Sequence, residues 1–120
     1  MKMTIERAAL LKSLGHVQSV VERRNTIPIL SNVKFEASDG AVRLNATDMD
    51  LDIVEQAVAI VDTPGATTVS AHTLYDIVRK LPEGAQVNMD GSGDGQVILS
   101  AGRSRFTLAS LPIDEFPVLS

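Results

Sequence analysis

The sequence predicts an α+β domain in which a mainly antiparallel sheet carries two amphipathic helices on one face. Two segments, 6–21 and 71–81, repeat apolar residues at helical spacing. Between and after them, apolar and polar residues alternate in short segments, as they do in half-buried strands. Turn residues of the hairpin type separate many of these segments, and hairpins join antiparallel strands.

The first predicted helix follows a short strand over residues 1–5. Its apolar face advances in steps of four, three and four and consists of Leu10, Leu14, Val17 and Val21. A polar stripe is offset by two residues, about 200° around a helix of ~3.6 residues per turn. The stripe contains bases and no acid, and its members are Lys12, His16, Ser19 and Arg23. From these residues alone, an ordinary solvated face is favoured over a binding face.

After a break at Pro28, the predicted strands cover 29–38, 42–46 and 51–61, with turns at Asp39-Gly40 and Pro64-Gly65. Ser70 is a suitable N-cap for the second helix. The helix ends at Leu81-Pro82-Glu83-Gly84, because proline cannot continue it and glycine permits a left-handed exit. Three further strands are predicted at 86–90, 96–101 and 103–109. Length and spacing alone reveal no internal repeat.

Composition bounds the class of protein. A chain of 120 residues, 44% of them hydrophobic, can form one domain with its own core. The absence of cysteine excludes disulfides and Cys-based metal sites, and fits a reducing cytoplasm. No apolar stretch approaches the ~18 residues that cross a bilayer, and the N-terminus does not resemble a signal peptide. The net charge of −4 argues against a protein that simply coats DNA.

An acidic segment, 48–55, is the first candidate site. Asp48, Asp50 and Asp52 alternate, and converging carboxylates bind hard cations. An EF-hand loop would need Gly and Glu where Ile53 and Ala59 stand. A solvated acidic edge is therefore favoured, and neither a metal nor a cofactor is predicted, although a small enzyme using this segment remains an alternative.

Catalytic motifs are weak elsewhere. The glycine-rich loop 91–95 lies between two strands, whereas a phosphate-binding loop leads into a helix. His16 and His72 are the only histidines, and no serine stands in a Gly-x-Ser-x-Gly turn. No catalytic residue is assigned.

The last predicted strand places Arg103, Arg105 and Thr107 on one face and Phe106 and Leu108 on the other. If this strand is an edge, its backbone can pair with another chain. Two interpretations remain open, because Phe106 and Leu108 could equally be ordinary core residues.

Motifs along the whole chain resemble the N-terminal domain of the bacterial sliding clamp, the beta subunit of DNA polymerase III. The longest are Arg24-Asn25-Thr26-Ile27-Pro28-Ile29-Leu30-Ser31-Asn32 and Asp76-Ile77-Val78-Arg79-Lys80-Leu81-Pro82-Glu83-Gly84. The others lie at 1–2, 4–7, 47–50, 64–69, 102–106, 111–112 and 116–117. Each is weak alone, but all occur in order over residues 1–120.

The resemblance implies a non-catalytic processivity factor of DNA replication, acting in the cytoplasm at the replication fork on the nucleoid. Clamps of this family are head-to-tail homodimers whose protomers have three similar domains. Their ring surrounds duplex DNA, with helices lining the hole, and tethers the polymerase. This chain would be the first of the three domains.

The resemblance also assigns residues. Arg24 matches a DNA-contacting position of the family, and Lys12, Arg23, Arg79 and Lys80 are weaker candidates. Such bases would attract phosphates without reading sequence.

At the dimer interface, Phe106 and Leu108 match the apolar part of the contact. Arg103 and Arg105 match bases that face acids of the partner. The chain departs from the family at His72-Thr73, which is often basic. It also lacks the second and third domains, through which the polymerase and the clamp loader are bound. A stand-alone interaction module using the 103–108 edge is the alternative.

Overall fold

The computed structural model describes residues 1–21, 27–91 and 95–117. The first half of the chain comprises β1 (Lys2–Glu6), α1 (Arg7–Gln18), the 3-10 helix η1 (Pro28–Ser31), β2 (Asn32–Ser38), β3 (Ala41–Thr47), β4 (Asp52–Val58) and β5 (Ile60–Thr63). The second half comprises β6 (Gly65–Ser70), α2 (Ala71–Arg79), β7 (Gln86–Asp90), β8 (Gln96–Ala101), β9 (Ser104–Ala109) and the 3-10 helix η2 (Ile113–Glu115).

Apart from β5, which has no counterpart in the second half, the two halves repeat one β-α-β-β-β pattern and exchange their first strands. β1 joins the strands of the second half in the sheet β5-β1-β7-β8-β9, and β6 joins those of the first half in the sheet β4-β3-β2-β6. The helices repeat as well, because Leu10, Leu14 and Val17 have the spacing of Leu74, Val78 and Leu81, and all six are buried. Spacing did not reveal this repeat beforehand, because only the strand pairing shows that the halves correspond.

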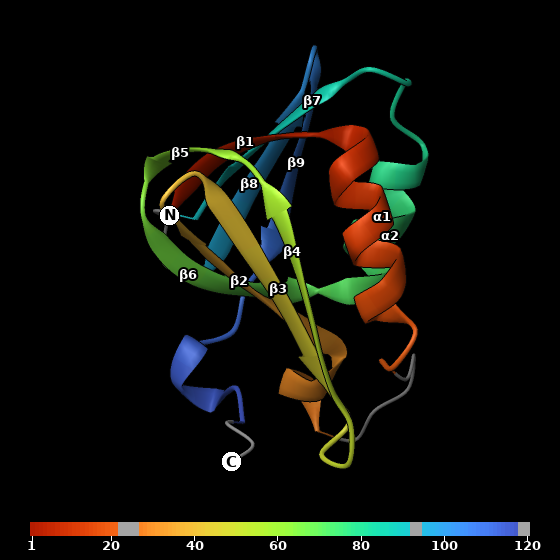
Figure 1. Cartoon of the computed structure of the whole chain (residues 1–120), viewed down its shortest axis with the longest axis vertical. Coiled ribbons are helices and arrows are strands. Elements are labelled where there is room, and N and C mark those ends of the chain that lie inside the picture. Colours follow the sequence, from red (N-terminus) through yellow and green to blue (C-terminus); the bar gives the residue numbers. More distant parts are fainter. Residues whose placement is uncertain (22–26, 92–94, 118–120) are drawn as a thin grey trace.

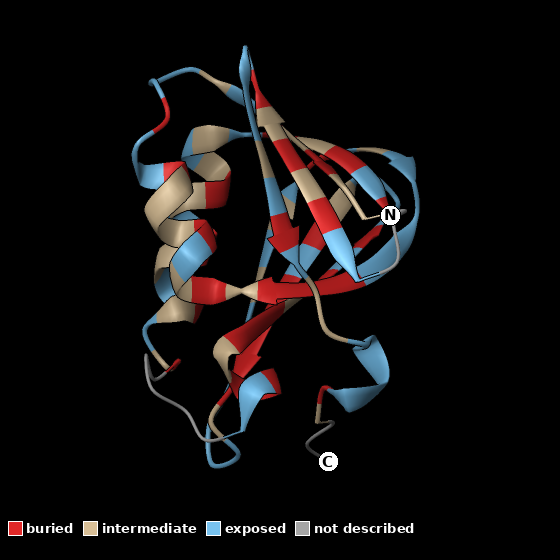
Figure 2. Ribbon diagram, turned by 180° about the vertical axis from the view of Figure 1, so that it is seen from behind, coloured by how far each residue is buried: buried red, intermediate tan, exposed pale blue. Residues whose placement is uncertain are grey.

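All the strand pairings are antiparallel, as predicted. The strands form two sheets, and both helices lie side by side on one side of the domain (Figure 1). Buried residues lie on both helices and on the strands of both sheets (Figure 2), and most of them belong to one hydrophobic core. Full burial of one large aliphatic side chain contributes about 1.5–3 kcal/mol. This core fixes the helices on their supporting strands.

The predicted turns and caps are confirmed. Asp39 and Gly40 both have positive φ, 51° and 73°, in the hairpin between β2 and β3. The Ser70 side chain accepts a hydrogen bond from the Thr73 N–H at 3.4 Å. β7 and β8 have the predicted bounds. The residues at these positions therefore form the hairpin turn and the helix cap that their local sequence predicts.

Several boundaries differ from the prediction, among them the end of α2 at Arg79 rather than at 81 and the start of β9 at Ser104 rather than at 103. The first helix ends at Gln18, because the amides of Ser19, Val20 and Val21 bond three residues back rather than four. The single strand predicted over 51–61 divides at buried Ala59, whose N–H bonds to the Gly40 carbonyl at 3.0 Å, and its two parts join different sheets. The segment 29–38 begins as η1, which Pro28 initiates, and β6 was not anticipated.

Candidate nucleic-acid interface

The two helices form one layer because their facing sides approach closely. A Cβ added at Gly15 of α1 would lie 3.6 Å from the Tyr75 ring of α2, at ordinary van der Waals distance, so the two helices face each other here. The outward side of α1 exposes Ala8, Lys12, His16 and Ser19. Lys12 takes part in no ion pair within the described part of the chain.

Arg79 is held on the outer surface of α2. Its guanidinium lies 5.3 Å from the centre of the Tyr75 ring, and its Nη2 donates to an Asp76 carboxylate oxygen at 3.0 Å. Asp76 offsets part of this charge, and an exposed pair of this kind is worth less than about 1 kcal/mol.

Lys80 lies about 100° further round the turn of α2 than Arg79. It lines a hollow of ≈ 390 Å³ together with Phe106 of β9. The two bases that the sequence presents as a pair therefore point to different parts of the surface.

Sequence reasoning missed Arg7, the first residue of α1. Its Nε donates to the Val78 carbonyl and its Nη2 to the Arg79 carbonyl, both at 3.0 Å. This places a third base at the carboxyl end of α2, where the helix dipole favours positive charge. The sequence did offer one signal. A basic residue in the first turn of a helix is unfavourable next to the positive end of the helix dipole, so a partner elsewhere in the fold could have been expected for Arg7.

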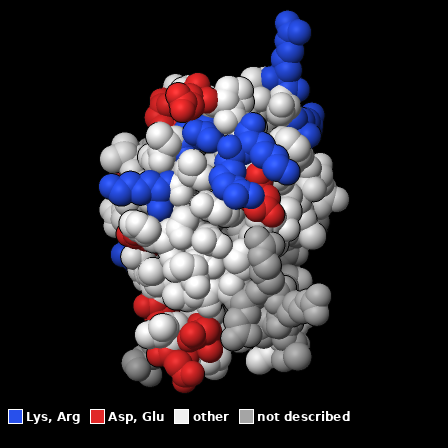
Figure 3. All heavy atoms as spheres, turned by 90° about the vertical axis from the view of Figure 1, so that its right-hand side faces the viewer, with Lys and Arg blue, Asp and Glu red and all other residues white. Residues whose placement is uncertain are grey.

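The helix side carries a basic patch that is interrupted by acids. Figure 3 looks onto this side, and Lys and Arg side chains gather over its upper half with Asp and Glu side chains among and around them. One acid reaches the polar stripe of α1 itself, because the Glu55 carboxylate from β4 bonds to His16 Nδ1. None of the four residues of the stripe is acidic, but the fold brings Glu55 of β4 next to it.

Arg23 and Arg24 lie outside the described residues, so their predicted role as DNA contacts stays a prediction. Val21 is the last described residue before them. It is buried and lies in the turn that follows α1. His72 Nε2 is 2.6 Å from the Val21 carbonyl oxygen.

The predicted edge strand is confirmed as an edge, because β9 ends its sheet. Arg105 and Thr107 are exposed, whereas Leu108 is buried and Phe106 packs against the core. Arg103 is exposed in the turn before β9 rather than on the strand.

The hollow between α2 and β9 exposes part of the Phe106 ring. Its walls are Thr73, Asp76, Ile77, Lys80, Leu81, Pro82, Ser104 and Phe106. An apolar side chain from another chain could enter it beside the open edge.

A second apolar edge was not predicted. β4 ends the other sheet, and Val54 and Val58 on it are 47% and 83% exposed. Leu51 before the strand and Ile60 after it are also largely exposed. The acids of 48–55 predicted a solvated edge here, and β4 is an edge strand, but the exposed apolar residues on it were not predicted.

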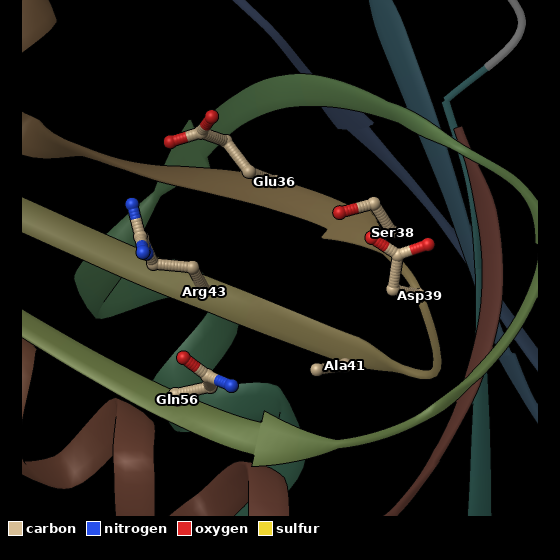
Figure 4. A pocket seen from close by; sticks show the side chains of 6 residues that line it. All are labelled: Glu36, Ser38, Asp39, Ala41, Arg43 and Gln56. Atoms are coloured by element: carbon tan, nitrogen blue, oxygen red, sulfur yellow. The ribbon is translucent and has the colours of Figure 1, made fainter.

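A third surface is a polar hollow of ≈ 290 Å³ on the sheet of β2–β4. Figure 4 shows Glu36, Arg43 and Gln56 rising from neighbouring strands, where Arg43 is paired in register with both others. Glu36 also forms an ion pair with Lys34 at 3.4 Å. The mixed charges give this surface no net attraction for a phosphate backbone.

The first residues of the acidic segment, 48–51, form a self-contained turn, whereas Asp52 and Glu55 lie on β4. One Asp48 carboxylate oxygen accepts hydrogen bonds from the N–H groups of Asp50 and Leu51, and these bonds hold the pKa of Asp48 below its usual value. Within the described ranges, no three His, Asp or Glu side chains are grouped as metal ligands would be. Among the same residues, no helix is long and apolar enough to cross a membrane.

Solved structures with this fold include DNA polymerase sliding clamps. A structure of the Caulobacter crescentus polymerase III beta superposes with a TM-score of 0.97 at 59% identity, covering 100% of this chain and 33% of that one. A sliding clamp from Bartonella birtlesii, bound to griselimycin, superposes with a TM-score of 0.96 at 44% identity, covering 100% and 32%.

The family model of the DNA polymerase III beta subunit, N-terminal domain, matches residues 1–120, and the chain belongs to this family. The beta sliding clamp of Caulobacter vibrioides strain NA1000 is 59% identical over 100% of the chain, and that of Escherichia coli K12 is 43% identical over 99%. The chain spans 32% of the length of each of these relatives.

Proposed function

We propose that this chain is one domain of a ring-shaped processivity clamp that encircles duplex DNA and tethers the replicative polymerase without catalysing a reaction. The observation that supports this most directly is the paired helix layer, which presents Lys12, Arg7 and Arg79 on one side of a domain of the clamp family. The protein would act in the cytoplasm, at replication forks on the nucleoid.

The chemistry of the helix side suits sliding. Lysine and arginine attract phosphates over a distance and carry no base-specific information. Arg24 and Arg23 would add to Lys12 and Arg79 on this surface, with Lys80 at its margin. A basic patch interrupted by acids such as Asp76 would give a shallow attraction, which allows movement along the duplex.

Ring closure requires two unlike edges on each building block, because head-to-tail contacts join different surfaces. β9 and β4 are the third strands after α2 and α1, and each ends its sheet. We assign β9, with Phe106 and Leu108 behind it and Arg103 and Arg105 beside it, to the contact between protomers. β4 would then contact the neighbouring domain of the same protomer, which would cover Val54 and Val58.

Polymerase and clamp loader would bind outside residues 1–120. The apolar site for their peptides belongs to the family's other domains, so no residue of this chain is assigned to them.

Retention on DNA with and without free ends tests the ring. The complete protein, loaded on nicked circular DNA, should remain bound through gel filtration and be lost after one restriction cut, because a ring slides off an end. An Arg24→Ala variant should bind duplex DNA more weakly at low salt, with its dimer constant unchanged.

Equal retention on cut and uncut circles would contradict encirclement. Unaltered affinity of the Arg24→Ala variant at low salt would remove Arg24 from the DNA surface while leaving the ring intact. A stable one-to-one complex of this chain with another protein, formed without DNA, would favour the stand-alone interaction module.

A further inference from the structure

Two side chains tie the ends of the helix pair together in a reciprocal way. Arg7, in the first turn of α1, binds the Val78 and Arg79 carbonyls at the end of α2. His72, in the first turn of α2, binds the Val21 carbonyl just beyond the end of α1. We call these two contacts the helix clasp.

Neither side chain suits the end of the helix on which it stands. The first turn of a helix has free N–H groups and favours acids, yet the first turns of α1 and α2 contain no acid. The last turn has free carbonyls, which hydrogen-bond donors satisfy. Because the helices run antiparallel, each donor lies at the amino end of its own helix and at the carboxyl end of its neighbour. The contact between helices therefore explains both residues.

The histidine ring is held by one nitrogen only. A carbonyl oxygen only accepts, so Nε2 must carry the hydrogen of the bond to Val21. Nδ1 is buried and has no hydrogen-bond partner among the described residues. A buried polar atom without a partner is unfavourable, so the bond to Val21, together with packing, determines how the ring is oriented.

Both contacts end beside bases that are proposed to face DNA. Val21 precedes Arg23 and Arg24 by two and three residues, and the carbonyl of Arg79 precedes Lys80 directly. A shift of either helix end would move the backbone that carries these bases, and with it the distance from their side chains to a phosphate.

We propose that Arg7 and His72 are positioning residues, which fix the two helix ends from which the basic side chains extend toward DNA. Neither needs to touch DNA for this. The inference rests on the proposed function, because it gives the helix pair a role in DNA binding. A basic residue, which the family often has at this position, would attract phosphate directly, whereas His72 is proposed to hold the end of the neighbouring helix in place.

Two uncharged replacements of His72 separate the roles. His72→Gln keeps an N–H donor near the position of Nε2, whereas His72→Phe keeps the volume and removes the donor. Thr68→Ala is the matched control, because it removes buried hydrogen bonds of β6 to Asn32 and Leu111 and destabilises the domain away from both contacts of the clasp. All are made in the complete protein, whose affinity for a duplex of mixed sequence is measured at low salt by fluorescence anisotropy.

We expect His72→Phe to lower affinity about fivefold, the effect of one lost hydrogen bond, while His72→Gln and Thr68→Ala stay near the parent. Equal losses in the Phe and Gln variants would show a direct contact with phosphate by the imidazole and overturn the inference. Equal losses in the Phe and Thr68→Ala variants would show general destabilisation and overturn it as well, as would no loss in any variant.

Amide hydrogen exchange separates the inference from the proposed function. The amides of Ser19, Val20 and Val21, which form the last turn after α1, should exchange about fivefold faster in His72→Phe and at the parental rate in His72→Gln. If the parent does not bind duplex DNA, the proposed function fails. Faster exchange in the Phe variant alone would then still establish the clasp, and identical exchange in all variants would refute it.

Discussion

At the scale of single residues, several polar side chains serve the nearby backbone. Thr47, which is 1% exposed, donates to the Leu51 carbonyl at 2.8 Å and accepts from the Met49 N–H at 3.1 Å. Asp48 accepts from two further N–H groups of the same turn. Met49 has a φ of 81°, a conformation that such bonds stabilise. Residues 47–51, which include the first acids of the acidic segment, therefore form a structural turn.

The lowered pKa of Asp48 makes its contribution depend on pH. Because the native state favours the carboxylate, its stabilising effect is complete above the unfolded value of 3.8 and is lost as the pH falls through the lower native value. We expect Asp48→Ala to lower the free energy of unfolding at pH 7, and the difference from the parent to shrink below pH 3.8. Urea unfolding at several pH values measures this.

Asp50→Ala is the control for that experiment, because Asp50 is exposed and its carboxylate forms no ion pair or hydrogen bond in the described structure. A difference between parent and Asp48→Ala that stays constant from pH 7 to pH 3 would contradict the assignment of the bonds to the ionised carboxylate.

At the scale of elements, β9 serves two purposes at once. Its inward residues pair in register with β8, Phe106 with Leu99 and Leu108 with Val97. Leu108 is 8% exposed and belongs to the core, whereas Phe106 also forms a wall of the hollow beside α2. Leu108 is therefore an ordinary core residue, whereas the contact of Phe106 with another chain stays a prediction.

Substitutions on β9 should separate folding from assembly. Leu108→Ala should lower the free energy of unfolding by about 2–5 kcal/mol, because it leaves a cavity in the core. Phe106→Ala should weaken the dimer of the complete protein roughly tenfold, because it removes apolar area from the proposed contact. Chemical unfolding and sedimentation equilibrium measure the two effects.

Thr107→Ala, on the exposed face of the same strand, should change neither quantity appreciably. An unchanged dimer constant for Phe106→Ala would mean that β9 is the wrong edge.

At the scale of the whole molecule, one domain is not sufficient for the proposed ring. β4 and β9 are edge strands at corresponding places in the two halves but carry different side chains, and one side of the domain carries both helices. Both edges carry or adjoin apolar surface, which neighbouring copies of the same architecture would cover. Several such domains placed edge to edge would direct all helix pairs toward a common centre.

The mass of the native protein tests this arrangement. The relatives are about three times as long as the chain, since it covers 32% of them. An antibody raised against this chain should therefore detect, in source cells, a protein of about three times 12.8 kDa. A native band at 12.8 kDa would favour a domain that works alone as an interaction module.

The sequence by itself determined the elements whose signals are local. Helical spacing located α1 and α2, Asp39-Gly40 and Ser70 located a hairpin and a cap, and alternation located the edge strand with Phe106 facing inward. Each of these signals lies within one window of about 11–18 residues. The resemblance to the clamp family extended this information to function, and the comparisons bear out the family.

Only the tertiary structure decided how these elements combine. The division into two sheets and the break at Ala59 depend on strand pairing between distant segments. The partners of Arg7 and His72 lie 71 and 51 residues away, and that of His16 lies 39 away. No local pattern encodes such contacts, because they form only when the core brings antiparallel helices and strands together. The division of roles between Arg79 and Lys80 has the same origin, since it depends on what each side of α2 contacts.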